Sequence, residues 1–271
     1  MTDRTQERCR VFRELHASGC FVIPNPWDAG SARTLVHLGF PALATTSAGF
    51  AWSQGHGDNH VSLEEALAHF RGIAAAVDLP VSGDFEGGFA VEPAEVEAHV
   101  ALAARTGIAG LSIEDASRQS ESPLLDFALA VERVAAARRA VDASGLDLVL
   151  TARSEGFIAG RPDLTETIRR LTAFADAGAD CLYAPGLQSI EDITAVVRAV
   201  APKPVNVLVG SPFTTVATLA AVGVRRISVG GALARAAWGG FLDAAAEIAG
   251  SGTFTALGRA VPFALVNGLF R

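Results

Sequence analysis

The feature that most constrains the fold is a repeated unit, in which a short apolar run is followed by a segment rich in alanine, leucine and arginine. Each segment ends at glycine or proline, which is the pattern of a strand followed by a helix. The runs are continuous rather than alternating, as in strands that parallel sheets bury on both faces. We expect strands at residues 20–23, 42–45, 79–83, 109–113, 147–152, 180–184, 204–209 and 225–229.

Helices between these strands complete the repeat. We expect them near residues 4–18, 31–37, 62–76, 92–105, 126–143, 163–177, 189–199 and 212–221, with a last helix from about Ala232. Eight alternating units predict an α/β fold of the (β/α)8 TIM-barrel type, which usually needs about 250 residues. The chain has 271 residues and no linker that divides it, so we expect one barrel domain over residues 1–271. A doubly wound open sheet is the alternative, but the sequence has no GxGxxG and no topological switch point.

Composition excludes several classes of partner. The net charge of −7 argues against a nucleic-acid surface, which needs a basic face. No apolar stretch reaches the roughly 18 residues of a membrane span, and no signal peptide precedes the first helix. The cysteines are few, odd in number and without metal-site spacing: Cys9, Cys20 and Cys181. This usage is typical of a reducing compartment, so we expect a cytoplasmic protein without nucleic-acid or membrane partners.

Acidic side chains follow two successive strands. Asp84 and Glu86 come after the third apolar run, and Glu114 ends the fourth. Carboxylates gathered at one end of a parallel sheet repel one another unless a cation lies between them. Oxygen ligands of this kind suit Mg²⁺, with Mn²⁺ as an alternative. The same residues could instead cap the following helices; their occurrence at matching ends of both strands favours the metal.

Lysine usage narrows the chemistry further. The only lysine, Lys203, precedes a strand, whereas barrel active sites lie at the opposite, carboxyl-terminal ends of the strands. This position disfavours a Schiff-base lysine at the active end. Carbonyl chemistry in this chain would rest on a metal.

Other residues after the strands complete the candidate site. The small residues 46–50 could leave backbone N–H groups open to an anion, or form an ordinary turn. Arg153, after the fifth strand, could pair with a ligand carboxylate or with Glu155. Asn206 offers neutral hydrogen bonds, and Asp58 lies in a glycine-rich loop.

At these residues the chain resembles the isocitrate lyase/phosphoenolpyruvate mutase superfamily over nearly its whole length. The likeness lies in Thr-Ser-Ala-Gly at 46–49 with Asp58 beyond it, Asp-Phe-Glu-Gly-Gly-Phe at 84–89, Ile-Glu-Asp at 113–115, Ala-Arg-Ser-Glu at 152–155, and the segment 227–236. The resemblance implies a Mg²⁺-dependent barrel that acts on small 2-oxo acids through a pyruvate enolate. It also implies a homodimer or homotetramer in which the last helix is exchanged between subunits, which suits the apolar tail at 253–271.

The resemblance also assigns roles. Metal ligands would be Asp84, Glu86 and Glu114, and catalytic residues Arg153, Asp58 and Glu114. The substrate would be held by Ser47, Ala48, Gly49 and Arg153. Asn206 is a further candidate for substrate binding, from its position at the seventh strand.

One loop departs from the family pattern. Lyases of the family carry a Lys-Lys/Arg-Cys-Gly-His loop after strand 4, and the mutase carries Lys-Thr-Asn-Ser. Here residues 117–125 read Ser-Arg-Gln-Ser-Glu-Ser-Pro-Leu-Leu. After strand 6, Tyr183 and its neighbours replace the lyase glutamate and the mutase histidine. The departures disfavour isocitrate cleavage and phosphonate mutation, and leave decarboxylation or hydrolytic cleavage of a 2-oxo acid open.

Three hypotheses follow. The first is an enzyme that cleaves a C–C bond, or with less support a P–C bond, in a 2-oxo acid. The second is a weakly catalytic or non-catalytic protein that binds Mg²⁺ and a 2-oxo acid, because the 117–125 loop lacks a cysteine, lysine or histidine. The third is a barrel whose acids only cap helices.

Overall fold

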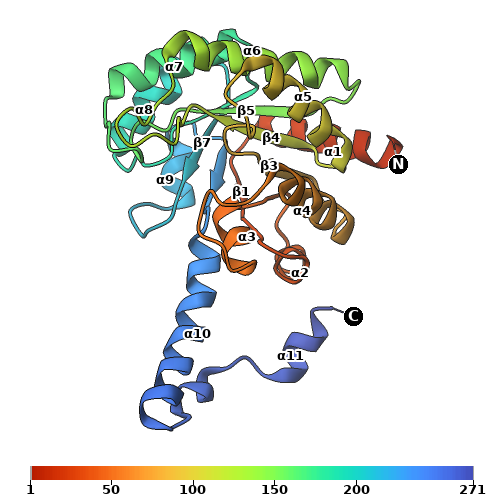
Figure 1. Cartoon of the computed structure of the whole chain (residues 1–271), viewed down its shortest axis with the longest axis vertical. Helices are drawn as coiled ribbons and strands as arrows, with labels where there is room; N and C mark the ends of the chain where they lie inside the picture. The colour runs from red at the N-terminus through yellow and green to blue at the C-terminus, as the bar shows by residue number, and fades with distance from the viewer. Residues whose placement is uncertain (1, 271) are drawn as a thin grey trace.

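A computed structural model describes residues 2–270 of the chain. In this part, eight parallel strands form one sheet in the order β1-β8-β7-β6-β5-β4-β3-β2, which curls into a nearly closed barrel (Figure 1). The strands are β1 (Phe21–Ile23), β2 (Leu43–Ala44), β3 (Val81–Asp84), β4 (Gly110–Glu114), β5 (Val149–Arg153), β6 (Cys181–Tyr183), β7 (Val205–Leu208) and β8 (Arg226–Ser228). The prediction of a (β/α)8 barrel and of its eight strands is confirmed.

The helices alternate with the strands, as predicted. They are α1 (Thr2–Ala17), α2 (Ala29–His37), α3 (Ser47–Ser53), α4 (Leu63–Ala76), α5 (Pro93–Ala103), α6 (Phe127–Ala143), α7 (Leu164–Asp176), α8 (Ile190–Ala199), α9 (Val216–Ala221), α10 (Ala232–Ser251) and α11 (Phe263–Gly268), with 3-10 turns η1 (Ala104–Thr106) and η2 (Thr255–Arg259). Side-chain caps fix where several of them begin. Asp28 accepts a hydrogen bond from Ser31 N at the start of α2, and Ser62 from Glu65 N at the start of α4.

Two helix predictions were wrong in detail. The helix expected from residue 212 begins at Val216, because the Thr215 side chain caps it by accepting from Thr218 N. The segment after β2, for which an open loop or an ordinary turn was expected, forms α3. Thr46 is its N-cap and accepts a hydrogen bond from Gly49 N, so a short local cap turns the predicted anion-binding loop into a helical turn.

The barrel closes between β1 and β2 through a few bonds rather than a regular ladder. Ala44 N donates to Pro24 O at 3.1 Å. The Asn25 side chain reinforces the seam: its Nδ2 donates to Thr45 O at 3.0 Å, and its Oδ1 accepts from Val229 N and Gly230 N, each at 2.9 Å. One buried amide thus ties together the ends of three strands.

The apolar core lies between the sheet and its surrounding helices. Phe12, Phe70, Ile108 and Phe174 are among its largest buried side chains. The inside of the barrel is different, because polar side chains from several strands are buried there. These are Ser82, Ser112, Thr151, Asn206, Arg226 and Ser228. A barrel interior is ordinarily filled by branched apolar side chains, so this polar layer calls for a functional explanation.

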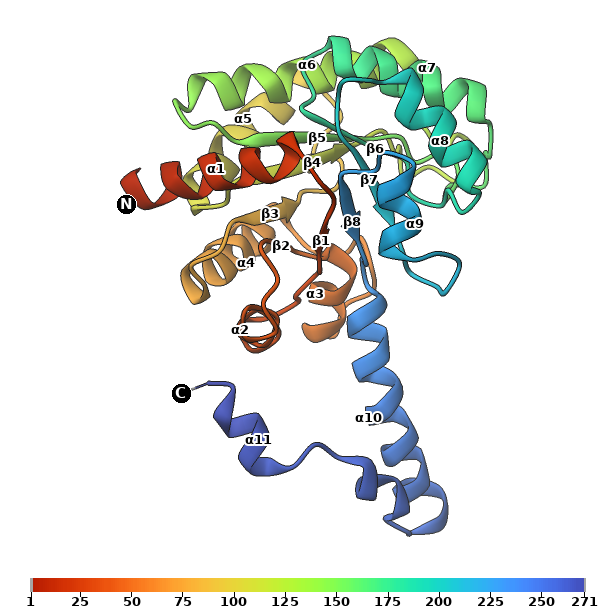
Figure 2. The ribbon, with the colours of Figure 1, turned by 180° about the vertical axis from the view of Figure 1, so that it is seen from behind.

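The C-terminal part of the chain leaves the barrel. Figures 1 and 2 show α10 extending away from the strands, with η2 and α11 beyond it. The apolar residues of this arm are exposed, among them Phe241, Phe254, Phe263 and Leu265. Most of the tail therefore does not pack on its own barrel, although the ring of Phe270 lies close to Gly30 of α2. Across residues 2–270, no helix is both long and apolar enough to cross a membrane.

Candidate active site

The site is built around Asp84, the last residue of β3. Its Oδ2 accepts hydrogen bonds from Ser47 N at 3.0 Å and from Ser47 Oγ at 2.8 Å. Its backbone N–H donates to Thr45 Oγ1 at 2.9 Å. Parallel pairing of β2, β3 and β4 brings these groups to one end of the barrel, so the convergence predicted for the strand ends is confirmed for Asp84 and Glu114.

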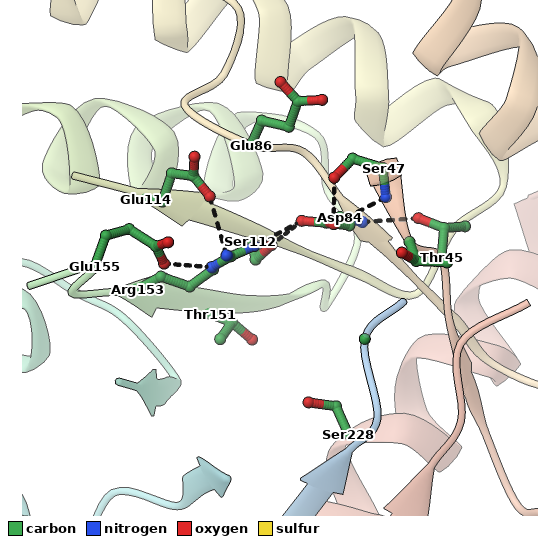
Figure 3. A network of polar contacts seen from close by, with 12 residues as sticks. Thr45, Ser47, Asp84, Glu86, Ser112, Glu114, Thr151, Arg153, Glu155 and Ser228 are labelled. Carbon is green, nitrogen blue, oxygen red and sulfur yellow. Dashed lines mark hydrogen bonds and ion pairs between the residues drawn. The ribbon is translucent and has the colours of Figure 1, made fainter. Parts of the chain in front are cut away.

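Arg153, the last residue of β5, lies among three carboxylates. Its Nη1 contacts Asp84 Oδ1 at 2.8 Å, its Nη2 contacts Glu114 Oε2 at 3.2 Å, and its Nε contacts Glu155 Oε1 at 2.9 Å. Figure 3 shows the guanidinium reaching from β5 toward all three. The predicted pairing with Glu155 is present, but Arg153 also bridges Asp84 and Glu114, which were predicted as metal ligands.

Glu86 stands apart from this group. Figure 3 shows its carboxylate on the far side of Asp84 and Glu114 from Thr151. It forms an ion pair with Arg118 from the loop after β4. Glu86 has a positive φ of 49°, a conformation that non-glycine residues adopt sparingly and that often accompanies functional sites.

The acids carry more negative charge than the arginines balance. Burial, followed by repulsion from Asp84, raises the pKa of Glu86 to about 7. Burial raises the pKa of Glu114 to about 8, although Arg153 opposes the shift. Burial also raises the pKa of Glu155 and of Asp58. Such shifts mark carboxylates in need of a further cation or a proton.

Two cavities meet at this cluster. The outer cavity has a volume of about 670 Å³, and its lining includes Ser47, Asp58, Glu86, Glu114, Arg118 and Arg153. The inner cavity, of about 240 Å³, extends into the barrel, and its lining includes Ala48, Asp84, Tyr183, Asn206, Arg226 and Ser228. Ser47, Asp58 and Arg153 line both. All the predicted site residues except Gly49 therefore line one cavity or the other.

The predicted substrate-binding residues are arranged differently from the expectation. Ser47 N and Gly49 N already donate to Asp84 and Thr46, respectively, so neither is an open donor. Ala48 lines the inner cavity. Asn206 is buried, and its amide bonds to Arg226 and Ser228 rather than pointing freely into solvent.

The donor set nevertheless fits Mg²⁺. Within residues 2–270, no three His, Cys, Asp or Glu side chains form a ready-made metal cluster, and Asp84 and Glu114 are paired with Arg153 instead. Around the two cavities, however, lie five carboxyl groups (Asp58, Asp84, Glu86, Glu114 and Glu155) and two guanidinium groups that pair with them (Arg118 and Arg153). Hard oxygen donors with surplus negative charge are the ligands that Mg²⁺ prefers.

Several residues that support the site were not identified in the sequence. Arg133, 1% exposed, donates from Nη1 to Glu114 O at 3.1 Å and from Nη2 to Ala90 O at 3.0 Å. Asp115 accepts from Glu155 N at 2.8 Å and pairs with Arg170 at 3.2 Å. These bonds fix the ends of β4 and β5. In the sequence, Asp115 could have been identified from its place in the Ile-Glu-Asp motif. Nothing in the sequence singled out Arg133.

The loop after β4 covers the outer cavity as a short hairpin. Ser117 N donates to Pro123 O and Leu125 N to Asp115 O, each at 2.9 Å. Arg118, Gln119 and Ser120 line the cavity. The loop therefore presents one guanidinium and neutral polar groups to the site.

Comparison with known proteins identifies the family. The profile described as phosphoenolpyruvate phosphomutase matches residues 12–249. A crystal structure from Burkholderia cenocepacia, provisionally named a lyase/mutase, is 49% identical with a TM-score of 0.96, and the match covers 99% of this chain and 98% of that one. An uncharacterized protein of Mycobacterium tuberculosis is 34% identical over 221 residues, or 81% of each chain.

More distant relatives carry named activities. The structure of phosphonopyruvate hydrolase with oxalate and Mg²⁺ has a TM-score of 0.85 at 25% identity, covering 97% of this chain and 94% of that one. The structure of oxaloacetate acetylhydrolase with its product oxalate has a TM-score of 0.86 at 25% identity, covering 98% and 94%. An oxaloacetate decarboxylase of Bradyrhizobium diazoefficiens is 30% identical over 193 residues, covering 68% and 65%.

Proposed function

The chain belongs to the phosphoenolpyruvate mutase/isocitrate lyase superfamily, and from this premise we propose that it is a Mg²⁺-dependent enzyme that cleaves a small 2-oxo acid through an enolate. The observation that carries the proposal is the Asp84–Arg153–Glu114 cluster at the junction of two cavities. Relatives named for oxaloacetate and phosphonopyruvate chemistry support the substrate class.

In this proposal, the acidic residues bind the metal and the arginine binds the substrate. Asp84, Glu86 and Glu114, with Asp58 at the cavity edge, would hold Mg²⁺, which supplies Lewis-acid stabilisation of developing negative charge on an oxygen. Arg153 would bind the 2-oxo acid and stabilise the enolate by charge-assisted hydrogen bonds. Ser47, through its bonds to Asp84, would keep that carboxylate oriented during the reaction.

The loop chemistry favours decarboxylation or hydrolytic cleavage over a reversible C–C lyase reaction. When a 3-carboxy-2-oxo acid loses CO₂, the electron pair of the broken C–C bond passes into the enolate, and carbon 3 then takes a proton. Water can deliver that proton, so no cysteine is needed. Residues 117–125 carry no cysteine or histidine, which agrees with this class.

A binding protein without turnover is the second candidate. The observation in its favour is the same loop, because it brings Arg118, Gln119 and Ser120 to the outer cavity but no proton donor such as cysteine, lysine or histidine. Cleavage of the P–C bond of phosphonopyruvate is a third, supported by the phosphonopyruvate hydrolase relative.

A turnover assay with oxaloacetate and Mg²⁺ tests the proposal and separates the reactions. Decarboxylation yields pyruvate and CO₂, whereas hydrolysis yields oxalate and acetate. Asp84→Ala should reduce turnover at least about 100-fold while circular dichroism shows an intact fold. Asp142→Ala, which changes an exposed carboxylate of α6, is the control and should be unaffected.

Spontaneous decarboxylation in Mg²⁺ sets the background of this assay. If the wild-type protein turns over neither oxaloacetate nor phosphonopyruvate faster than Asp84→Ala does, the enzyme proposal is wrong. Binding without turnover would then favour the second candidate.

We also propose that the protein assembles as a homodimer or homotetramer through its C-terminal arm. The apolar side chains of α10, η2 and α11 are exposed in the single chain, and contiguous apolar surface of this extent marks an interaction site. A symmetric assembly would bury the arm of each subunit against a neighbour.

We also propose a cytoplasmic location, because the cysteines form no disulfide bonds. Cys9, Cys20 and Cys181 are free thiols, as in proteins of reducing compartments. Cell fractionation checks this, and recovery of the protein from an oxidising compartment would contradict it.

A further inference from the structure

Arg226, at the start of β8, is a buried cation inside the barrel. The residue is 5% exposed. Its Nε donates to Asn206 Oδ1 at 2.9 Å and its Nη2 to Thr151 Oγ1 at 3.0 Å. Its Nη1 lies 3.3 Å from His16 Nε2. All three partners sit on different elements, so the guanidinium is held from three sides.

The histidine among these partners is neutral. A guanidinium can only donate hydrogen bonds, so His16 Nε2 accepts, and its Nδ1 carries the proton that is donated to Phe12 O at 2.7 Å. Burial, together with the charge of Arg226, lowers the pKa of His16 to about 3. All three hydrogen-bond partners of Arg226 are therefore uncharged.

No carboxylate pairs with Arg226 among the described residues. Arg153, by contrast, contacts three acids. A buried charge without an ion partner is costly, and an anionic group of a ligand beside it would lower that cost. A guanidinium has five N–H donors, and three are used, so two remain.

The position of Arg226 shows where such a charge would lie. Arg226 lines the inner cavity together with Asp84, Arg153 and Ser228. Its partner Thr151 is two residues before Arg153 on β5, so both side chains point to the same face of the sheet. In Figure 3, Thr151 and Ser228 lie on the opposite side of the Arg153–Asp84 pair from Glu86. Arg226 thus forms part of the cavity floor beneath that pair.

We propose that Arg226 is a specificity-determining residue that binds a second anionic group of the substrate at the floor of the inner cavity. The inference rests on the proposed 2-oxo acid site and deepens it. A substrate would place its 2-oxo carboxylate end at Arg153 and extend a second carboxylate or phosphonate toward Arg226, with Asn206 and Ser228 beside it. The cavity of about 240 Å³ has room for an acid of this size.

Calorimetric titration of the whole protein in Mg²⁺ tests the proposal. 3,3-Difluorooxaloacetate supplies a dianion, 2-oxobutyrate a monoanion of similar length, and phosphonopyruvate tests the phosphonate form of the second group. Wild-type protein should bind a dianion about 10-fold or more tightly than 2-oxobutyrate. Arg226→Met should abolish that preference and leave the affinity for 2-oxobutyrate within about twofold.

Arg225→Met is the matched control. Arg225 precedes Arg226 on the chain, and its side chain donates to Gly19 O rather than into the cavity, so this variant should keep the preference. If Arg226→Met does not fold, Arg226→Gln replaces it, because glutamine removes the charge and keeps hydrogen-bonding capacity.

The outcomes separate this inference from the proposed function. Equal weakening of both ligand types in Arg226→Met would overturn it, since a purely structural role predicts that result. A wild-type protein that binds 2-oxobutyrate as tightly as the dianions would also overturn it while leaving the proposed function standing. If the wild-type protein binds none of the ligands, both the inference and the proposed function fail.

Discussion

At the scale of single residues, the site is a balance between carboxylates and arginines. Arg153 neutralises part of the charge of Asp84, Glu114 and Glu155, yet the pKa of Glu114 stays raised to about 8 and that of Glu86 to about 7. Near neutral pH, these two carboxyl groups are therefore partly protonated and carry less than their full negative charge. A divalent cation would replace those protons, so metal binding and proton release should be coupled.

The pH dependence of stability follows from these two acids. Because the folded protein binds protons that the unfolded chain, with an ordinary glutamate pKa of 4.5, has already lost, the free energy of unfolding should fall as pH rises through 7 and 8. The buried His16 and His69 have lowered pKa values, so they act in the opposite direction until the unfolded chain has lost its histidine protons, about one pH unit above 6.5. The window from about pH 7.5 to 8.5 therefore reports mainly on the acids.

Urea unfolding at several pH values measures this slope. With chelator present, stability should fall across the window by up to about 1.4 kcal/mol per pH unit for each proton of difference. Glu114→Gln, which removes the titrating group, should flatten the slope, and saturating Mg²⁺ should reduce it. Stability that rises with pH across the same window would contradict the assigned shifts.

At the scale of elements, a single side chain makes most of the hydrogen bonds described at the seam between β1 and β2. The Asn25 amide makes three hydrogen bonds to backbone groups of the residues after β2 and β8. Asn25→Ala leaves those groups without their partner and should lower the free energy of unfolding by about 2–4 kcal/mol. Chemical denaturation measures the loss.

Gln54→Ala is a suitable control for the seam, because this amide is exposed and bonds only to Ser53. It should change stability by less than about 0.5 kcal/mol. Equal stability of the Asn25→Ala and Gln54→Ala variants would show that backbone hydrogen bonds such as the one from Ala44 N to Pro24 O close the barrel without the Asn25 amide.

The strands and the acids at their ends could be predicted from the sequence. Each βα unit is local, and the carboxyl ends of parallel strands meet at one edge of a barrel, so Asp84 and Glu114 had to converge. Helix α3 was missed because its seven residues include two serines and a glycine, which favour turns. The cap at Thr46 that decides the matter is visible only in three dimensions.

The partners of buried arginines could not be predicted. Arg226 contacts side chains from β5, β7 and α1, and which strands face one another across a barrel depends on its stagger rather than on sequence spacing. The same applies to Arg133, which bonds to the loop after β3 and to β4. Arginine side chains are mostly exposed in folded proteins, so residue type gave no sign that these two are buried.

At the scale of the whole molecule, the exposed C-terminal arm predicts association. Phe263 is 82% exposed, and Phe263→Glu would place a charge where a subunit contact should bury an apolar ring. Sedimentation of the wild-type protein should show a dimer or tetramer, and the variant should shift toward monomer. Leu38→Glu, which alters an exposed leucine of the barrel (65% exposed), should leave the assembly unchanged.

A wild-type monomer at micromolar concentration would refute the proposed assembly. So would an assembly that Phe263→Glu leaves intact while Leu38→Glu disrupts it, because the contact would then lie on the barrel rather than on the arm.

The most direct test of the central claim is thermal unfolding of the wild-type protein with pyruvate, oxaloacetate, 2-oxoglutarate or phosphonopyruvate, each with Mg²⁺ and with chelator. A ligand at 100 times its dissociation constant should add about 2.7 kcal/mol of stability. We expect such a gain with at least one of these acids in Mg²⁺, and its loss both in chelator and in Asp84→Ala. An unchanged unfolding temperature with every acid, or a gain that persists in chelator, would contradict a Mg²⁺-dependent 2-oxo acid site at Asp84 and Arg153.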